Sequence, residues 1–159
     1  MCYTSGIRIG TALDVHGFSD NGVLKLGLQN FPDYHQLDGD SDADVVAHAL
    51  SDAFLLAAGL PDLGGLIGVG EKEWKGASGR RILERVLQEV KSAGFVPESA
   101  SVQIVARRPR LLSVLPNMRN DISSVVGCQV NVSATTTDGL ISDLGNGNCI
   151  MAIATVLLV

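Results

Sequence analysis

Hydrophobic and polar positions divide the chain into short apolar segments that have the character of β-strands. The first covers residues 7–18 and ends in polar side chains. Asn21-Gly22 is a typical hairpin turn, so the alternating segment 23–28 is expected to be the return strand. Residues 101–106, the β-branched segment 130–136 and the apolar segment 150–159 complete the predicted strands.

Three segments have the spacing or composition of helices. The alanine-rich segment 43–58 follows Ser41, which we expect to be its N-cap, with Asp44 three residues later as in a capping box. Segment 78–93 is amphipathic and stops at Gly94, and segment 115–126 has Pro116 in its first turn. Residues 30–42 and 59–77 are expected to be irregular. The order β-β-α-α-β-α-β-β predicts one α+β domain over residues 1–159, with a mixed sheet covered by helices on one face.

The composition of the chain argues against several classes of protein. The net charge of −5 argues against a nucleic-acid-binding protein, and the ten apolar residues at the C-terminus are too few to cross a bilayer. Residues 1–6 lack the pattern of a signal peptide. Cys2, Cys128 and Cys149 form no CxxC pair, which fits a reducing, cytoplasmic location. An apolar content of 46% with few aromatic residues hints at an oligomer.

Asp14, His16 and His48 are the strongest candidates for chemistry. Residues two apart on a strand face the same way, so Asp14 and His16 could share one metal ion with a histidine from the neighbouring helix. Asp44 and Asp52 lie four residues on either side of His48, where a carboxylate could fix the histidine tautomer. The alternatives are a polar residue at a strand end for His16 and a hydrogen-bonded core histidine for His48. His35, in a polar segment, is expected to be solvated.

Two further segments have weaker signals. Residues 134–139 read Ala-Thr-Thr-Thr-Asp-Gly, which offers hydroxyl groups and one hard oxygen ligand suited to Mg²⁺, Asp138. Without other support, a simple turn is the better interpretation of this segment. The segment 107–110, Arg-Arg-Pro-Arg, is either a solvated loop or a positive loop near a phosphate or a base, and segment 61–65 is either a plain turn or a ribose-binding loop.

Taken together and in order, these blocks resemble 2-C-methyl-D-erythritol 2,4-cyclodiphosphate synthases, enzymes of the non-mevalonate isoprenoid pathway. The resemblance runs from residue 7 to the C-terminus. It implies a homotrimer with active sites between subunits, Zn²⁺ or another divalent transition metal on Asp14, His16 and His48, and Mg²⁺ or Mn²⁺ bound with the substrate through Asp138. Thr136 and Asp40 correspond to catalytic positions. The substrate-binding positions that the resemblance implies are Asp14, Val15, His16, Asp40, Ser41, Asp62, Leu63, Gly64, Ala106, Pro109, Arg110, Leu111, Leu112, Ala134, Thr135, Thr136, Thr137 and Asp138.

The implied reaction is that of a phosphorus–oxygen lyase. The 2-phosphate of 4-diphosphocytidyl-2-C-methyl-D-erythritol 2-phosphate attacks the β-phosphorus, which gives the cyclodiphosphate and CMP. Asp40 departs from the family, which usually has histidine there, and segments 67–72 and 145–148 also differ from the family pattern. The alternative functions are a divergent metal-dependent hydrolase or a binding protein for a cytidine diphosphate compound.

Overall fold

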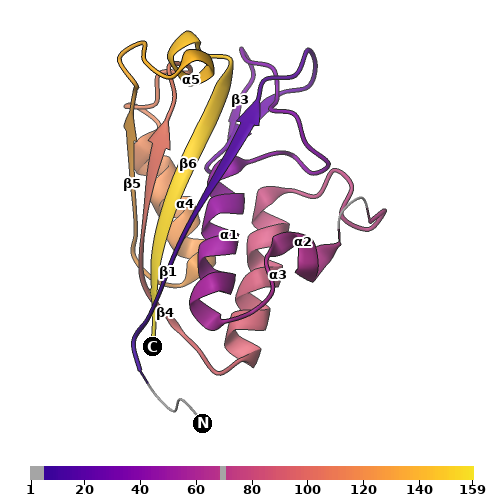
Figure 1. The fold of residues 1–159 in the computed structure, drawn as a ribbon, viewed down its shortest axis with the longest axis vertical. Coiled ribbons are helices and arrows are strands. Elements are labelled where there is room, and N and C mark those ends of the chain that lie inside the picture. The colour runs from indigo at the N-terminus through magenta and orange to yellow at the C-terminus, as the bar shows by residue number, and fades with distance from the viewer. Residues whose placement is uncertain (1–5, 69–70) are drawn as a thin grey trace.

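A four-stranded mixed sheet forms the centre of the protein, in a computed structural model that describes residues 6–68 and 71–159. The strands lie in the order β1-β6-β4-β5 (Figure 1). Their bounds are β1 Arg8–Gly17, β4 Pro97–Val105, β5 Val130–Thr135 and β6 Cys149–Leu158. Strand β6 is antiparallel to both β1 and β4, whereas β4 and β5 are parallel. Strands β1 and β5 are therefore the two edges of this sheet.

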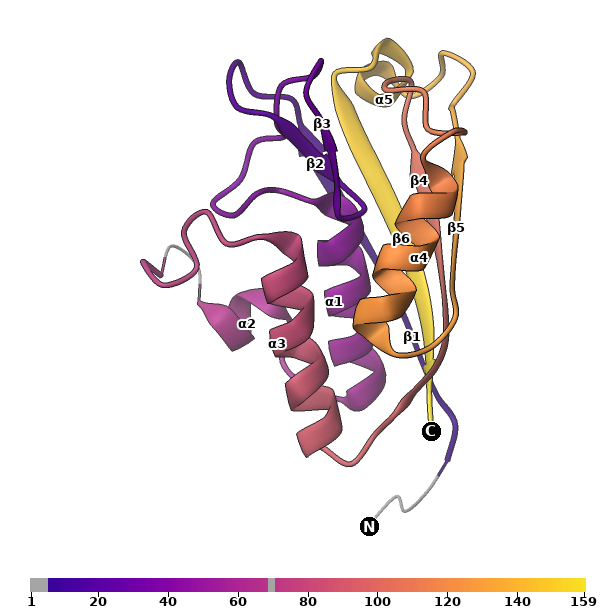
Figure 2. The same cartoon turned by 180° about the vertical axis from the view of Figure 1, so that it is seen from behind.

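Three long helices lie on one side of the sheet (Figure 2): the first and third pack on its strands, and the second packs mainly against the first. They are α1 (Val45–Ala58), α3 (Gly79–Ser92) and α4 (Leu115–Val126), and the bounds of α4 agree with the prediction. Two short helices, α2 (Leu63–Ile67) and α5 (Ser142–Asn146), lie in segments for which no helix was expected. The core between the sheet and the helices contains large buried side chains such as Leu50, Phe54, Ile104, Ile122 and Ile150. The predicted α+β architecture with helices on one face is confirmed.

The opposite face of the sheet has no helix over it (Figure 1). On β1 this face carries Ile9, Leu13 and Val15, which are 67%, 59% and 47% exposed. Such a row of apolar side chains on one face is characteristic of an interaction surface.

None of the helices in the described residues is long and apolar enough to span a membrane. Cys128 and Cys149 are free thiols, and Cys2 lies outside the described residues.

The predicted pairing of segment 23–28 with the first strand is wrong. Residues Leu24–Leu26 form β2 and pair with β3 (Gln29–Phe31) in a separate two-stranded sheet. Gly27 and Leu28, both with positive φ, make the tight turn between these strands. Segment 36–38 instead lies beside the end of β1, where Phe18 forms a bridge with Leu37. The Asn-Gly signal thus marks a bend in the chain, but not a hairpin between the expected strands.

The predicted start of the first helix is also wrong. Asp44, not Ser41, is the N-cap of α1, and its buried carboxylate accepts hydrogen bonds from the backbone N–H groups of Val46 and Ala47. Ala43 has a φ of +54°, which is incompatible with a right-handed helix at this position. The helix therefore begins after this residue, and Ser41 is left available for a different role.

Candidate metal centre and substrate-binding site

Gly10 allows β1 and α1 to approach each other closely enough to build a site between them. A Cβ atom at this position would lie 2.0 Å from the Ala53 carbonyl oxygen and 2.8 Å from the Ala57 nitrogen. From Gly10 to Asp14 the strand advances roughly 13 Å. From Ala57 back to His48 the helix covers about the same distance. The close contact at Gly10 therefore brings His48 level with Asp14.

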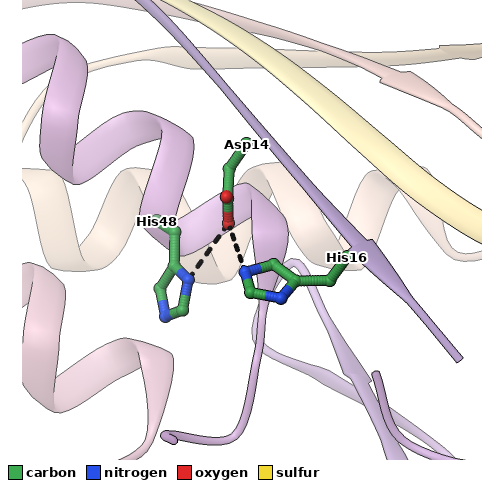
Figure 3. Close-up of side chains that lie close together, drawn as sticks. All are labelled: Asp14, His16 and His48. Carbon is green, nitrogen blue, oxygen red and sulfur yellow. Dashed lines mark hydrogen bonds and ion pairs between the residues drawn. The ribbon is translucent and has the colours of Figure 1, made fainter. Parts of the chain in front are cut away.

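Asp14 lies between the two histidine rings (Figure 3). Its Oδ2 atom is 3.1 Å from His16 Nε2 and 3.1 Å from His48 Nδ1. One ligand atom from each of the three residues lies within 4.8 Å of the others, and all three side chains are half-buried. The predicted alternation on β1 is confirmed, because Asp14 and His16 both face α1. Two imidazoles and one carboxylate are a common set of protein ligands for a catalytic zinc ion, with a further position left for substrate.

The second nitrogen of each histidine has its own partner. His16 Nδ1 donates to the Asp38 carbonyl oxygen at 2.5 Å, and this fixes the tautomer because a carbonyl can only accept. His48 Nε2 lies 3.0 Å from Ser41 Oγ, and the tautomer that donates to Ser41 leaves the Nδ1 lone pair facing Asp14. Hydrogen-bond partners such as the Asp38 carbonyl and the Ser41 hydroxyl, which do not themselves bind the metal, orient the ligands of protein metal sites. The described residues thus fit a divalent transition metal.

The expected partners of His48, Asp44 and Asp52, do not take this role. The Asp44 carboxylate also accepts hydrogen bonds from the N–H groups of Gly27 and Leu28, and Asp52 accepts one from Leu63 N. Helical spacing placed these carboxylates near His48, but unpaired backbone donors in neighbouring loops are their actual partners. Asp44 therefore holds the β2–β3 turn onto α1, and Asp52 holds the start of α2.

The electrostatics of the cluster also favour a bound cation. Burial raises the pKa of the Asp14 carboxyl, but when the His16 and His48 rings are protonated their hydrogen bonds to Asp14 outweigh this effect and lower the pKa below its ordinary value. The hydrogen bond to Asp14 raises the pKa of His16. Asp14 is thus ionised under ordinary conditions, and its charge draws a positive charge to this point, whether a proton or a metal ion.

The cluster opens into a cavity of about 470 Å³. Several predicted site residues, Asp40, Ser41, Leu63 and Gly64, line this cavity beside the candidate metal ligands. Asp62 begins α2 and caps it by accepting a hydrogen bond from Gly65 N. Val15 is exposed on the open face of the sheet, opposite to Asp14, so only its backbone could serve this cavity.

The other predicted site residues gather at the opposite edge of the sheet. Thr136, Thr137 and Asp138 follow β5 and line a second cavity of about 230 Å³, together with Arg107. Thr136 Oγ1 is 3.1 Å from Asp138 Oδ1, and Asp138 has a φ of +53°. Ala134 and Thr135 lie on β5 itself and are exposed.

The segment after β4 lies beside this second group. Ala106 N donates to the Thr135 carbonyl oxygen, and residues Pro109, Arg110, Leu111 and Leu112 continue from there. The guanidinium groups of Arg107 and Arg108 donate to the carbonyl oxygens of Gly145 and Gly147. These two arginines are therefore committed to the 145–147 turn rather than fully solvated. Two predicted groups of site residues thus lie at opposite edges of one sheet and do not meet within one chain.

Several contributors to this region were not predicted as site residues, among them the Asp38 carbonyl, which bonds to His16, and Trp74 and Lys75, which line the cavity. No local pattern identifies a carbonyl as the partner of a histidine 22 residues away. Trp74 had one usable signal, because it is the single tryptophan of the chain and lies in a glycine-rich segment. Of the unusual 67–72 segment, residues 69–70 lie outside the described residues, whereas Ile67, Gly68 and Glu71 line the cavity.

Comparison with known proteins places this geometry in a family. The model of the YgbB family matches residues 7–159, nearly the whole chain. The chain belongs to the YgbB family. The 2-C-methyl-D-erythritol 2,4-cyclodiphosphate synthase of Acidothermus cellulolyticus is 41% identical over 151 residues, which cover 95% of this chain and 93% of the relative. The enzyme of the same name from Escherichia coli strain 536 is 38% identical and covers 96% and 98%.

Solved structures agree with this assignment. A 2C-methyl-D-erythritol-2,4-cyclodiphosphate synthase in its CDP-bound form has a TM-score of 0.86 and 27% identity, and the match covers 96% of this chain and all of that one. The bifunctional IspDF of Campylobacter jejuni has a TM-score of 0.90 and 30% identity. This YgbB-family chain spans only 42% of that longer protein.

Proposed function

We propose that the protein converts 4-diphosphocytidyl-2-C-methyl-D-erythritol 2-phosphate to 2-C-methyl-D-erythritol 2,4-cyclodiphosphate and CMP. One observation carries the proposal: Asp14, His16 and His48 converge in the cavity that Asp40 and Ser41 also line. The names of relatives with about 40% identity over nearly the whole chain support the same lyase activity in isoprenoid precursor synthesis. The CDP-bound relative supports a cytidine diphosphate group as part of the ligand.

The reaction needs little proton chemistry from the protein. An oxygen of the 2-phosphate forms a bond to the β-phosphorus, and the bond from that phosphorus to the bridging oxygen breaks, so CMP leaves with that oxygen. The attacking oxygen is already an anion, so no general base is required. Positioning the two phosphates and covering their charge are therefore the main tasks of the site.

The chain's own residues divide these tasks. Asp14, His16 and His48 would hold Zn²⁺ or a similar metal, and Asp138 would hold Mg²⁺ or Mn²⁺ together with the substrate. A bound divalent cation draws charge from phosphate oxygens. We assign the Thr136 hydroxyl as a hydrogen-bond donor to the diphosphate. Asp40 replaces the usual histidine, and we assign its carboxylate to the sugar hydroxyls, because these are donors.

A homotrimer with sites between subunits is part of the proposal. The metal ligands lie at the β1 edge, whereas Thr136 and Asp138 follow β5 at the other edge. A second copy could bring its β5 edge beside the β1 edge of the first, and three copies would close a ring. The apolar open face of β1 favours such packing. Cytoplasmic location remains a prediction from the sequence.

Phosphorus NMR of the reaction products tests the proposed activity. With the cytidine substrate, zinc and magnesium, we expect the two coupled signals of a cyclic diphosphate together with that of CMP. A product containing an oxygen from solvent water, followed with ¹⁸O-labelled water, would instead identify a hydrolase, the function that the Asp40 substitution favours. Binding without any product would identify a binding protein and contradict the proposal.

A further inference from the structure

Lys75 is the feature of the metal cavity that the proposed reaction leaves without a role. It is the one lysine or arginine among the described residues that line this cavity. Those residues also include four carboxylates, Asp14, Asp40, Asp52 and Glu71. A substrate with three phosphate groups would meet strong repulsion from these carboxylates, so a cation at this point has a large effect on its binding.

The turn that carries Lys75 is attached directly to the loop that carries Asp40. The N–H of Gly76 donates to the Asp40 carbonyl oxygen at 2.8 Å, and the N–H of Asp42 donates to the Ala77 carbonyl oxygen at 3.0 Å. Ala77 N also donates to the Trp74 carbonyl oxygen at 3.0 Å, which closes the turn around Lys75. Lys75 is therefore held at the same rim as Asp40, although its side chain is exposed and can reach a ligand.

Arg81 holds the adjacent wall of the cavity in place. Its guanidinium carbon lies 4.6 Å from the centroid of the Trp74 ring, and its nitrogens donate to the carbonyl oxygen and the carboxylate of Glu73 at 3.1 and 3.3 Å. Trp74 is half-buried and lines the cavity. Because Arg81 lies in the first turn of α3, it ties the indole ring to a rigid element.

We propose that Lys75 binds a phosphate group of the substrate through its ammonium group, and that Arg81 is a positioning residue that holds Trp74 against the sugar carbons. The inference rests on the proposed function. An ammonium group is a mobile point charge that suits a phosphate without fixed orientation. In this chain Asp40 cannot donate to a phosphate when ionised, so Lys75 supplies the positive contact at this rim.

The first test compares Lys75→Gln with Lys72→Gln, since Lys72 lies in the same exposed segment and does not line the cavity. Loss of a charge-assisted hydrogen bond should lower kcat/KM for the cytidine substrate by about tenfold to a hundredfold. Lys75→Arg should recover part of the loss, and bound zinc should stay at the wild-type level in all three variants. A Lys75→Gln enzyme within twofold of wild type, or one that has lost its zinc, would overturn the inference.

The second test uses Trp74, the single tryptophan, as a fluorescent reporter. We expect substrate to change its emission in the wild type, and Arg81→Gln to weaken this response and raise KM with little change in kcat. An unchanged KM and response in Arg81→Gln would reject the positioning role. Titration with inorganic phosphate tests the Lys75 phosphate site separately from the synthase activity. Suppose that the wild type forms no cyclic product, but that phosphate alters Trp74 emission in the wild type and not in Lys75→Gln. The proposed synthase activity would then be wrong, whereas the phosphate site at Lys75 would be supported.

Discussion

Replacing Gly10 by alanine should disrupt the metal centre from a distance of more than one helical turn. The added Cβ would lie 2.0 Å from the Ala53 carbonyl oxygen and 2.8 Å from the Ala57 nitrogen. Both atoms belong to the backbone of α1, so no side chain can rotate away to make room. Helix α1 must move away from β1 instead, which should cost about 3 kcal/mol of unfolding free energy, at the upper end of typical overpacking effects.

The same movement should reach the metal ligands. His48 lies on α1 and Asp14 on β1, so a shift of the helix lengthens the distance between them. Metal–ligand distances tolerate changes of only about 0.2 Å, so a backbone shift of roughly 1 Å exceeds what side-chain adjustment easily absorbs. We therefore expect Gly10→Ala to bind zinc at least tenfold more weakly than the wild type, even under conditions where it remains folded.

Urea unfolding and a zinc competition titration check both expectations. Gly17→Ala is the matched control, since Gly17 lies on the same strand and an added Cβ would have only one neighbour within 4 Å, the Asn148 carbonyl oxygen at 3.8 Å. The control should lose less than about 1 kcal/mol and keep its zinc affinity. If Gly10→Ala behaved like the control in both measurements, close packing of α1 on β1 would not be what positions His48.

Four further predictions concern individual side chains. Ser41→Ala should weaken zinc binding about tenfold to a hundredfold in a chelator competition, because it removes the hydrogen-bond partner of His48 Nε2. His48→Ala should abolish stoichiometric zinc, as measured by elemental analysis, and full zinc in that variant would contradict the ligand assignment. Asp138→Ala should keep zinc but lower the magnesium-dependent rate on the order of a hundredfold, and an unchanged rate at limiting magnesium would make Asp138 a turn residue only. Asp44→Ala should lower the unfolding free energy by about 3 kcal/mol in urea, because it leaves buried N–H groups at the β2–β3 turn and the start of α1 without a partner; a loss below about 1 kcal/mol would show that water satisfies those groups.

The convergence of the three candidate metal ligands could be predicted from the sequence because local geometry determines most of their arrangement. Strand alternation places Asp14 and His16 on one face, and the helical pattern around His48 places that residue on the element that packs next to it. The partners of the carboxylates could not be predicted in this way. Asp44 bonds to Gly27 and Leu28, whose N–H groups are free only because a tight turn forms there.

The placement of the two predicted groups of site residues at opposite edges of the sheet could not be derived from residue spacing. Strand β5 follows β4 as its parallel neighbour, but β6 inserts between β4 and β1, so Asp138 ends far from Asp14 in the order of the sheet. Spacing along the chain contains no information on this insertion. The wall formed by Trp74 and Arg81 escaped prediction for a related reason, because it depends on contact between an irregular segment and the first turn of α3.

The two edge strands have a consequence for the newly made chain. Within the described residues, no strand pairs with the outer side of β1 or of β5, and the open face of β1 carries exposed apolar side chains. Unpaired edges next to apolar surface are the features through which folded chains aggregate. In the proposed homotrimer, assembly would therefore have to outpace aggregation while each copy is alone. The recovery of native protein on refolding should consequently depend on chain concentration, with assembly limiting at low concentration and aggregation at high concentration.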